Sequence, residues 1–591
     1  MMTRMSIDQA MELARRHHQA RQLEQAAAIY HQVLTAVPDH LDALQLQGLA
    51  ALDLNRPDAA AELFARALAI QPNSAELNYN MGVARMFLRQ TERAVEAFRR
   101  AIALQPTMTR AHGNLAAALL TLSRYDDAIA VCRAALAIEP NHADSLNNLG
   151  VAMKETDQLE EAAKSFEQAV RIEPRFLAAH TNLATTLQRL SRFPESAEAY
   201  RRAIKLAPDQ ADLYSGLGRV LADDNQLRAA RQAFEAAIKL KPDLGDAHTN
   251  LANVLHSMGE YELAISAARR AITCQPEAAL PKYNLSLMLL TRRQFDEGWK
   301  LHESRFDVTQ LDVQRHNFGR PIWDGSNFDG KTLLLNAEQG SGDTIQFARY
   351  LPMIRQRGGR IILGCQRELV RLMQRMDGLE RVLWDVDASL DFDLACPLLS
   401  LPAVFGTNES NIPAAVPYLG AYPQDTAKWK QRVPDDRALS RIGIVWAGRP
   451  GHANDRNRSM SLGQFVDLSK QDGIWLCSLQ KGPGAAQLSS APQGMKIADF
   501  TNDLTDFAET AALIENLDLV ITVDTSVAHL AGALGKPTWV LLPFVPDWRW
   551  MLDRDDSPWY PTMRLFRQHT PGDWQDVMHR VARAIQTDSR P

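Results

Sequence analysis

The chain has 591 residues and a formal net charge of −5 at pH 7. This length predicts two to four domains, and the mild acidity gives no electrostatic case for nucleic-acid binding. No apolar run is long enough to span a bilayer, and residues 1–22 lack the continuous apolar core of a secretory signal. The five cysteines show no metal-like spacing. These features together predict a cytoplasmic protein.

The first half of the chain is a repeat array with a period of 34 residues. Prolines stand at this interval, at Pro38, Pro72, Pro106, Pro140, Pro174, Pro208, Pro242 and Pro276. Small residues such as Gly48, Gly82 and Gly150 recur in phase with them. Small side chains let paired helices approach closely, and a proline ends the second helix. The pattern resembles tetratricopeptide repeats and predicts an α-solenoid over residues 1–306, with eight regular repeats and an irregular ninth at 280–306.

An asparagine recurs at one position of the repeat, two residues before the small residue of the first helix. The series is Asn80, Asn114, Asn148, Asn182, Asn250 and Asn284. An asparagine side chain both donates and accepts hydrogen bonds, so a ladder of them could hold the backbone of an extended acceptor peptide. The alternative interpretation is that each asparagine bridges neighbouring repeats or meets solvent. A similar ladder lines the repeats of O-GlcNAc transferase, which favours the peptide-binding interpretation.

The second half has a different composition, because all eleven tryptophans lie between Trp299 and Trp574. Residues 325–332 fit a phosphate-binding P-loop pattern, but the loop precedes the predicted strand 332–336 instead of following one. We therefore reject a nucleoside-triphosphatase. The stronger signal follows that strand, where Gly340 and Gly342 form a turn and Asp343 begins a helix that is expected to end near Pro352. Further strands are predicted at 360–363, 381–384 and 392–395.

The second lobe begins after a polar segment, residues 423–438, which is interpreted as a linker. Its first strand, 441–446, ends at Trp446 and is followed by Gly448, and the next loop carries Arg456 and Arg458. A second strand, 474–479, leads to Lys481. Residues 500–517 are expected to hold an amphipathic helix, residues 543–561 a loop rich in tryptophan and proline, and residues 573–585 a terminal helix.

A strand-turn-helix unit at residues 517–534 organises this lobe. The buried strand 519–523 stops at Asp524, Thr525 and Ser526, and a helix that contains His529 follows. Such a turn offers free backbone N–H groups, hydroxyls and the positive end of a helix dipole, so it suits a phosphate. Capping of the helix alone would also explain these residue types.

The two turns together resemble the paired signatures of heptosyltransferase-like glycosyltransferases, which have the two-lobed GT-B fold. The matching residues are Gly342-Asp343 with Leu351-Pro352, and Asp524-Thr525-Ser526 with His529-Leu530-Ala531. Across nearly all of its length the chain resembles bacterial tetratricopeptide-repeat glycosyltransferases of the flagellin-modifying kind, through residues 338–340, 443–448 and 547–550. The resemblance implies two Rossmann-like lobes, an acceptor lobe at 307–425 and a nucleotide-sugar lobe at 426–591.

The resemblance also implies roles for single residues. Asp343 matches the general base, with Glu338 as the open alternative. Sugar-donor binding is expected from Gly340, Gly342, Trp446, Gly448, Arg456, Arg458, Lys481, Asp524, Thr525, Ser526 and His529. The sequence departs from the lipopolysaccharide enzymes at Ser526, where they have glycine. It also lacks the lysine that follows their first second-lobe strand, so Arg456 or Arg458 would supply that charge.

The function expected from these residues is protein O-glycosylation, with transfer of a sugar from a nucleotide sugar to serine or threonine of a flagellin-like acceptor. One base suffices for inversion. The Asp391-Phe392-Asp393 run lies in a strand-like segment without a second metal signature, which predicts metal-independent transfer. The resemblance allows a CMP-linked nonulosonic acid such as pseudaminic acid, or a nucleoside-diphosphate sugar, and no other cofactor. A non-catalytic repeat scaffold and a transferase acting on a glycan or lipopolysaccharide are the alternatives, and the oligomeric state stays open.

Overall fold

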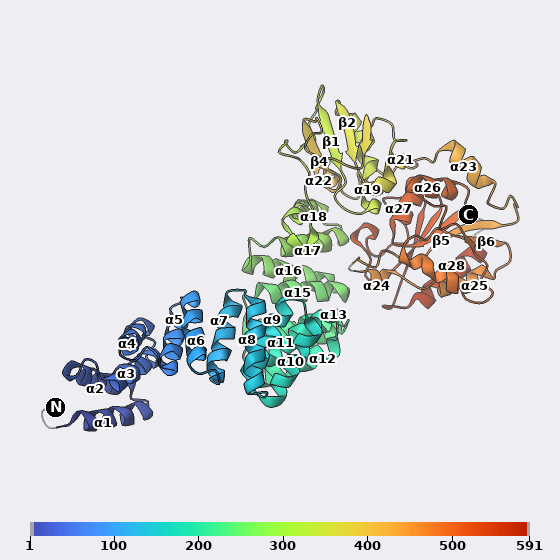
Figure 1. The fold of residues 1–591 in the computed structure, drawn as a ribbon. Coiled ribbons are helices and arrows are strands. Elements are labelled where there is room, and N and C mark those ends of the chain that lie inside the picture. The colour runs from blue at the N-terminus through green and yellow to red at the C-terminus, as the bar shows by residue number, and fades with distance from the viewer. Residues whose placement is uncertain (1–4, 453, 588–591) are drawn as a thin grey trace. The chain divides into compact units, whose positions relative to one another are not determined.

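The computed structural model describes residues 5–452 and 454–587, and the chain divides into two units, residues 1–242 and 243–591. The repeats form successive pairs of antiparallel helices (Figure 1). The first unit holds α1 (Ile7–Gln19), α2 (Leu23–Ala36), α3 (Leu41–Asp53), α4 (Pro57–Ile70), α5 (Ala75–Phe87), α6 (Thr91–Leu104), α7 (Thr109–Thr121), α8 (Tyr125–Ile138), α9 (Ala143–Glu155), α10 (Leu159–Ile172), α11 (Leu177–Arg189), α12 (Phe193–Leu206), α13 (Ala211–Asp223) and α14 (Leu227–Leu240). The second unit begins with α15 (Gly245–Ser257), α16 (Tyr261–Cys274), α17 (Ala279–Thr291) and α18 (Phe295–His302).

The repeat pattern of the sequence explains how each helix pair packs. The second helix of each regular pair ends two residues before a phased proline, as α4 does before Pro72. The phased glycines leave room for an aromatic ring of the partner helix. A Cβ on Gly48 would lie 2.5 Å from Phe64, and one on Gly150 would lie 2.7 Å from Phe166. The predicted solenoid is confirmed.

The first lobe contains a four-stranded parallel sheet in the order β3-β2-β1-β4. Its strands are β1 (Thr332–Asn336), β2 (Arg360–Gly364), β3 (Arg381–Leu383) and β4 (Leu394–Pro397), and its helices are α19 (Ser341–Phe347), α20 (Leu351–Arg355), α21 (Val370–Met373) and α22 (Leu401–Val404). The helix after the glycine turn, α19, ends at Phe347 rather than near Pro352 as expected. A separate helix, α20, begins beside that proline. Proline fits the first turn of a helix, where its missing N–H has no partner to lose.

The second lobe contains a six-stranded parallel sheet in the order β10-β9-β8-β5-β6-β7. Its strands are β5 (Ser440–Val445), β6 (Ile474–Ser478), β7 (Ala498–Asp499), β8 (Leu519–Val523), β9 (Thr538–Leu542) and β10 (Met563–Arg567). Its helices are α23 (Pro423–Lys430), α24 (Asp455–Arg458), α25 (Val466–Ser469), α26 (Phe507–Glu515), α27 (Ser526–Ala533) and α28 (Trp574–Thr587). The predicted class, a solenoid followed by an α/β region with parallel sheets, is confirmed.

Two segments of this lobe differ from expectation. The segment interpreted as a linker contains α23, whose Trp429 is buried and donates its indole N–H to Glu509 Oε2 at 2.7 Å. The expected amphipathic helix is the shorter α26, and it is buried from Ala508 to Ile514 rather than on one face. It is buried on more than one side because α21, α23 and α27 all pack against it.

Strand order places the two predicted turns at equivalent points. In each sheet the chain order reverses beside the first strand, between β1 and β4 in one lobe and between β5 and β8 in the other. Ligands of open parallel sheets bind in the crevice outside the carboxyl ends of the strands at such a reversal. The turns after β1, β5 and β8 therefore lie where a ligand site is expected.

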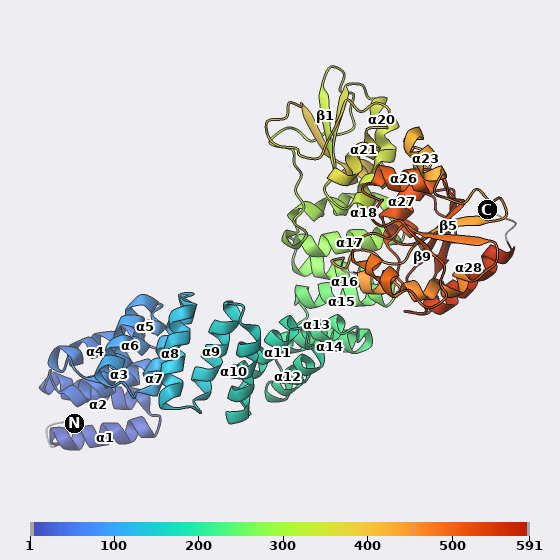
Figure 2. The same ribbon diagram turned by 45° about the vertical axis from the view of Figure 1, so that its right-hand side comes forward.

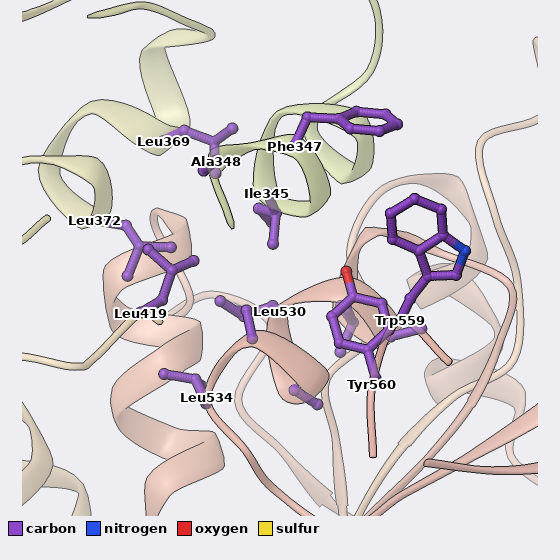
Figure 3. Packing of buried hydrophobic residues seen from close by; sticks show 14 of the residues in the cluster. Ile345, Phe347, Ala348, Leu369, Leu372, Leu419, Leu530, Leu534, Trp559 and Tyr560 are labelled. Carbon is purple, nitrogen blue, oxygen red and sulfur yellow. The ribbon is translucent and has the colours of Figure 1, made fainter. Parts of the chain in front are cut away.

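The lobes and the last repeat share one hydrophobic core. Residues of α18 such as Trp299, of α19 such as Ile345 and of α27 such as Leu530 belong to the same buried cluster. Figure 3 shows Ile345 and Phe347 of the first lobe above Leu530 and Tyr560 of the second. Figure 2 shows α15 to α18 stacked in order at the start of this unit.

Candidate active site

The turns after β1 and β8 meet directly. Helices α19 and α27 pack on each other, and a Cβ built on Gly342 would lie 3.0 Å from Cδ2 of His529 and 3.4 Å from the Cα of Ser526. Only a residue without a side chain lets the two turns approach this closely. The structure therefore brings together Gly340, Gly342 and Asp343 of one lobe with Asp524, Thr525, Ser526 and His529 of the other.

Asp343 lies at the start of α19 with both carboxylate oxygens engaged. Its Oδ2 accepts a hydrogen bond of 3.0 Å from the backbone N–H of Gly340, which is the expected capping contact. Its Oδ1 accepts one from Nη2 of Arg549, a residue of the second lobe. Burial raises the pKa of the Asp343 carboxyl, and the Arg549 guanidinium opposes that shift.

Arg549 is a site residue to which the sequence assigned no role. Besides Asp343 it donates from Nη1 to Asp547 Oδ1 at 2.9 Å and from Nε to Gln346 Oε1 at 2.6 Å. Its side chain is only 11% exposed. The sequence offered one signal, since the run Asp547-Trp548-Arg549-Trp550 follows β9, the strand beside β8. A charge so soon after a buried strand lies at the ligand edge of the sheet.

The Asp524–Ser526 turn is built as a helix entrance. Thr525 is the N-cap of α27, and its hydroxyl contacts that of Thr522 at 3.1 Å rather than a backbone N–H of the helix. Burial, and next the charge of Asp547, raises the pKa of Asp524 to about 6. Arg458 donates from Nη1 to the carbonyl of Asp524 at 3.1 Å. The turn therefore combines the positive end of a helix dipole with one arginine, a combination that suits an anion.

His529 lies one turn into α27 but is turned toward the interior. Its Nδ1 is 3.0 Å from the hydroxyl of Tyr560, and its ring stacks on Trp550 with centroids 5.4 Å apart. Burial lowers the pKa of His529 well below its ordinary value, so the imidazole is neutral. These contacts hold the His529 ring in the position in which it meets Gly342.

The glycine loop after β5 positions Arg458. A Cβ on Gly448 would lie 2.7 Å from Nη2 of Arg458 and from Oδ1 of Asp455, so the missing side chain makes room for the guanidinium. Ser459 accepts from the Gly448 N–H at 2.9 Å and fixes the loop. Trp446 is fully buried, with its indole N–H donated to the Gly484 carbonyl at 3.2 Å, so it supports the lobe from within.

The other two predicted cations have different surroundings. Arg456 is exposed on the short helix α24. Lys481 follows β6, two strands from β8, and its ammonium donates to the Thr501 carbonyl at 2.5 Å. Arg458 contacts the carbonyl of Asp524 at the turn.

Glu338, the alternative base, is turned away from the turns and buried. Its Oε1 accepts from Nη2 of Arg305 at 2.9 Å, and neither side chain is exposed. Burial raises the pKa of Glu338 to about 7. Arg305 also donates to Ser400 at 2.8 Å and to Glu303 at 2.7 Å. These contacts tie the loop before Asp343 to the end of the last repeat.

The acidic run Asp391–Asp393 has a structural explanation. Oδ2 of Asp393 accepts from the backbone N–H of Thr332 at 2.7 Å and so closes the start of β1, whereas Asp391 is exposed. Among residues 5–452 and 454–587, no group of three or more His, Cys, Asp or Glu side chains is arranged to hold a metal ion.

The asparagine ladder makes contacts between repeats. Four of the six side-chain amides donate to the preceding repeat: Asn114 to the Tyr79 hydroxyl at 3.0 Å, Asn148 to the Gly113 carbonyl at 3.2 Å, Asn182 to Asn147 Oδ1 at 3.0 Å and Asn284 to Asn253 Oδ1 at 3.0 Å. Asn80 is buried, and Asn250 is partly buried. The alternative interpretation, bridging of neighbouring repeats, describes these contacts, which occupy an amide N–H of each bridging residue.

The last repeats contact the two α/β lobes. Trp299 donates its indole N–H to the Thr407 carbonyl at 2.8 Å and meets Trp548 edge to face, with centroids 5.1 Å apart. Tyr283 on α17 lies in the field of the Asp343, Asp547 and Arg549 charges, while burial raises the pKa of its phenol. Repeat residues therefore form part of the surroundings of Asp343.

Family models match both halves of the chain. The model of the C-terminal domain of cilia and flagella-associated protein 70 matches residues 2–216, and a tetratricopeptide-repeat model matches residues 215–279. The model of glycosyltransferase family 9 (heptosyltransferase) matches residues 465–541, which include Lys481, the Asp524 turn and His529. The chain joins tetratricopeptide repeats to a heptosyltransferase-like domain.

Relatives were found for parts of this chain. Protein FlbA of Caulobacter vibrioides is 27% identical over 335 residues, which are 52% of this chain and 55% of FlbA. The match thus spans about half the length of that relative. YrrB, a tetratricopeptide-repeat protein with an unusual peptide-binding site, is 24% identical over 32% of this chain and 96% of its own, with a TM-score of 0.30. MamA of Desulfovibrio magneticus is 26% identical over 29% and 97%, with a TM-score of 0.28.

Within residues 5–452 and 454–587, no helix is long and apolar enough to cross a membrane.

Proposed function

We propose that this protein is a GT-B glycosyltransferase that moves a sugar from a nucleotide sugar to a serine or threonine hydroxyl of a protein acceptor. The observation that carries the proposal is the meeting of Asp343 with the Asp524–Ser526 turn at the reversal points of two parallel sheets. A potential base on one lobe then faces a potential phosphate site on the other. The heptosyltransferase match over the second of these turns supports the same chemistry.

Each part of the reaction has a residue to serve it. The acceptor oxygen attacks the anomeric carbon while the bond from that carbon to the phosphate oxygen breaks. Asp343 takes the hydroxyl proton, and its pKa, raised by burial, suits that role. The departing phosphate keeps the electron pair and is stabilised by the N–H groups of α27, the Thr525 and Ser526 hydroxyls and Arg458. One displacement inverts the anomeric centre, and no metal ion is invoked.

The acceptor is proposed to be a flagellin-like protein held by the repeats, with the reaction in the cytoplasm. Tetratricopeptide solenoids present extended surfaces to proteins. The sugar donor is proposed to be a CMP-linked nonulosonic acid or a nucleoside-diphosphate sugar. All five cysteines are free thiols, which agrees with a reducing compartment.

Mass spectrometry of the proteins of a flagellated bacterial host, with and without this chain, tests the proposal. The expected result is a sugar-sized mass increase on serine or threonine of one acceptor, absent with Asp343→Asn. A mass increase on lipopolysaccharide alone would assign a glycan acceptor instead. If neither changes and a panel of nucleotide sugars is not consumed by purified enzyme, the transferase assignment is wrong.

A further inference from the structure

Arg549 connects the proposed base to the proposed phosphate site, so a role for it in the reaction rests on the proposed glycosyltransferase function. Its guanidinium is held by two carboxylates, Asp343 and Asp547, and by the amide oxygen of Gln346. Its central carbon also lies 4.4 Å from the ring centroid of Trp548. The three anchors other than Asp343 keep the side chain in the site when the Asp343 contact is broken.

Both carboxylate oxygens of Asp343 already have a hydrogen-bond donor, and one of the two donors is a cation. Oδ2 is occupied by the Gly340 N–H and Oδ1 by Arg549. The Gly340 contact belongs to the cap of α19 and is fixed by the backbone. A carboxylate that is paired with a cation is a weaker base than one without that partner. Arg549 is therefore the partner whose departure would strengthen Asp343 as a base.

The Asp524–Ser526 turn lies beside the residues that flank this ion pair. A Cβ on Gly342, next to Asp343, would lie 3.4 Å from the Cα of Ser526. Trp550, next to Arg549, stacks on His529 of α27 with ring centroids 5.4 Å apart. Asp524 begins the turn whose N–H groups and Arg458 contact suit a phosphate. A diphosphate bound there would offer the guanidinium an anion more highly charged than one carboxylate.

We propose that Arg549 exchanges partners during the reaction: it pairs with Asp343 in the free enzyme and with the phosphate of the bound nucleotide sugar. The exchange frees Oδ1 of Asp343 when the sugar donor is in place. It also removes a cation from the carboxylate and adds a phosphate nearby, and both changes make Asp343 a stronger base. Binding of the sugar donor therefore activates the base. In the absence of the sugar donor the activated carboxylate does not form.

Nucleotide affinity gives the first test. Calorimetry on the full chain with UDP, GDP, ADP, dTDP and CMP should find at least one ligand for the wild type. Arg549→Gln should bind that ligand at least about tenfold more weakly, because charge-assisted hydrogen bonds to phosphate are lost. Arg432→Gln is the matched control, since Arg432 pairs with Asp503 at 2.8 Å in the same lobe. Its affinity should equal that of the wild type.

The pH profile gives the second test and separates an exchange from a simple binding role. The acid-side pKa seen in kcat, which reports the enzyme with its substrates bound, should exceed that seen in kcat/KM for the sugar donor by about one unit or more. Arg549→Gln should narrow this difference, because its free enzyme already lacks the cation beside Asp343.

The outcomes distinguish the two proposals. Absence of binding by any nucleotide contradicts the proposed function, and this inference with it. Nucleotide binding that is unchanged in Arg549→Gln, together with an unchanged pKa difference, overturns the inference and leaves the proposed function standing. If Arg549→Gln does not fold, Arg549→Lys is measured instead. The expected result is severalfold weaker nucleotide binding and a smaller difference between the pKa seen in kcat and that seen in kcat/KM. Wild-type values for both quantities would overturn the exchange.

Discussion

Gly342 of the first lobe lies against the imidazole of His529 in the second, with 3.0 Å between its virtual Cβ and Cδ2 of the ring. His529 cannot yield easily, because it stacks on Trp550 and contacts the Tyr560 hydroxyl. A methyl group at Gly342 would therefore push α19 and α27 apart by several tenths of an ångström.

We predict that Gly342→Ala lowers turnover by about tenfold or more with little loss of thermal stability, since catalysis depends steeply on alignment. Gly463→Ala is the control, because its added Cβ would meet its nearest neighbour at an ordinary 3.6 Å. Initial-rate assays and thermal melts of both variants provide the comparison. Equal activity of the two variants would show that the contact does not set the geometry of the site.

Asp343→Asn should fold normally and lower turnover by roughly 10²–10⁴-fold, the usual contribution of a general base. In the wild type the rate should fall as the pH drops through the pKa of Asp343, because the base must be ionised. Burial places that acid limb above the ordinary value of 3.8. A pH–rate profile of wild type and variant checks both points, and near-normal turnover by a folded variant would remove Asp343 from the mechanism.

The three predicted cations should differ in their effect on nucleotide binding. Arg458→Gln should weaken binding by about tenfold, because its guanidinium contacts the Asp524 carbonyl at the turn. Arg456→Gln and Lys481→Gln should have smaller effects, since one side chain is exposed on α24 and the other is held at Thr501. Calorimetry with one nucleotide ranks the three. A larger loss with Lys481→Gln would move the phosphate toward β6.

Glu338 should make stability depend on pH. Its pKa is about 7 in the folded chain against an ordinary 4.5, so the folded state holds this proton longer than the unfolded state. Its contribution to stability is full below about pH 4.5 and is lost as the pH rises through 7. Glu338→Gln has no such dependence. The melting temperature of Glu338→Gln minus that of wild type should therefore increase between pH 5 and 8. A difference that stays constant over this range would contradict the raised pKa of Glu338.

Replacing Asn114, Asn148 and Asn182 together by alanine should lower the melting temperature of the repeats. Three hydrogen bonds between repeats are lost, each worth about 1 kcal/mol. Asn250→Ala is the control, because Asn250 makes no side-chain hydrogen bond among the residues that the structure describes. Melts monitored by circular dichroism measure the stability, and acceptor modification is assayed in parallel. Loss of modification without loss of stability would favour direct contact with an acceptor peptide.

Regular, local signals made most of the fold predictable from the sequence. The 34-residue spacing placed the helix pairs, and the continuous apolar runs placed β1 and β8 at their observed bounds. The prediction missed β10, an edge strand with an exposed arginine inside it, and the two-residue β7. It also took α26 for an amphipathic helix, because local periodicity does not show how many neighbours will cover a helix.

Only part of the candidate site could be predicted from the sequence, because local signals mark only some of its residues. Asp343 and the Asp524 turn stand beside recognisable strand-to-helix signals. Arg549 does not, because its role arises from contacts with residues about 200 positions away in the sequence. The inward direction of His529 and Glu338 likewise depends on partners from other segments, Tyr560 and Arg305.

The burial of Trp299 and Arg305 among residues of the α/β lobes bears on how such proteins can be recombined. A chimera joined near residue 306 would strip the first lobe of an indole and a buried guanidinium that complete its interior. A junction at Pro242 keeps both side chains in the same unit as the lobe against which they pack. The exchangeable part is then residues 1–242, whereas α15–α18 stay with the lobes whose core they complete.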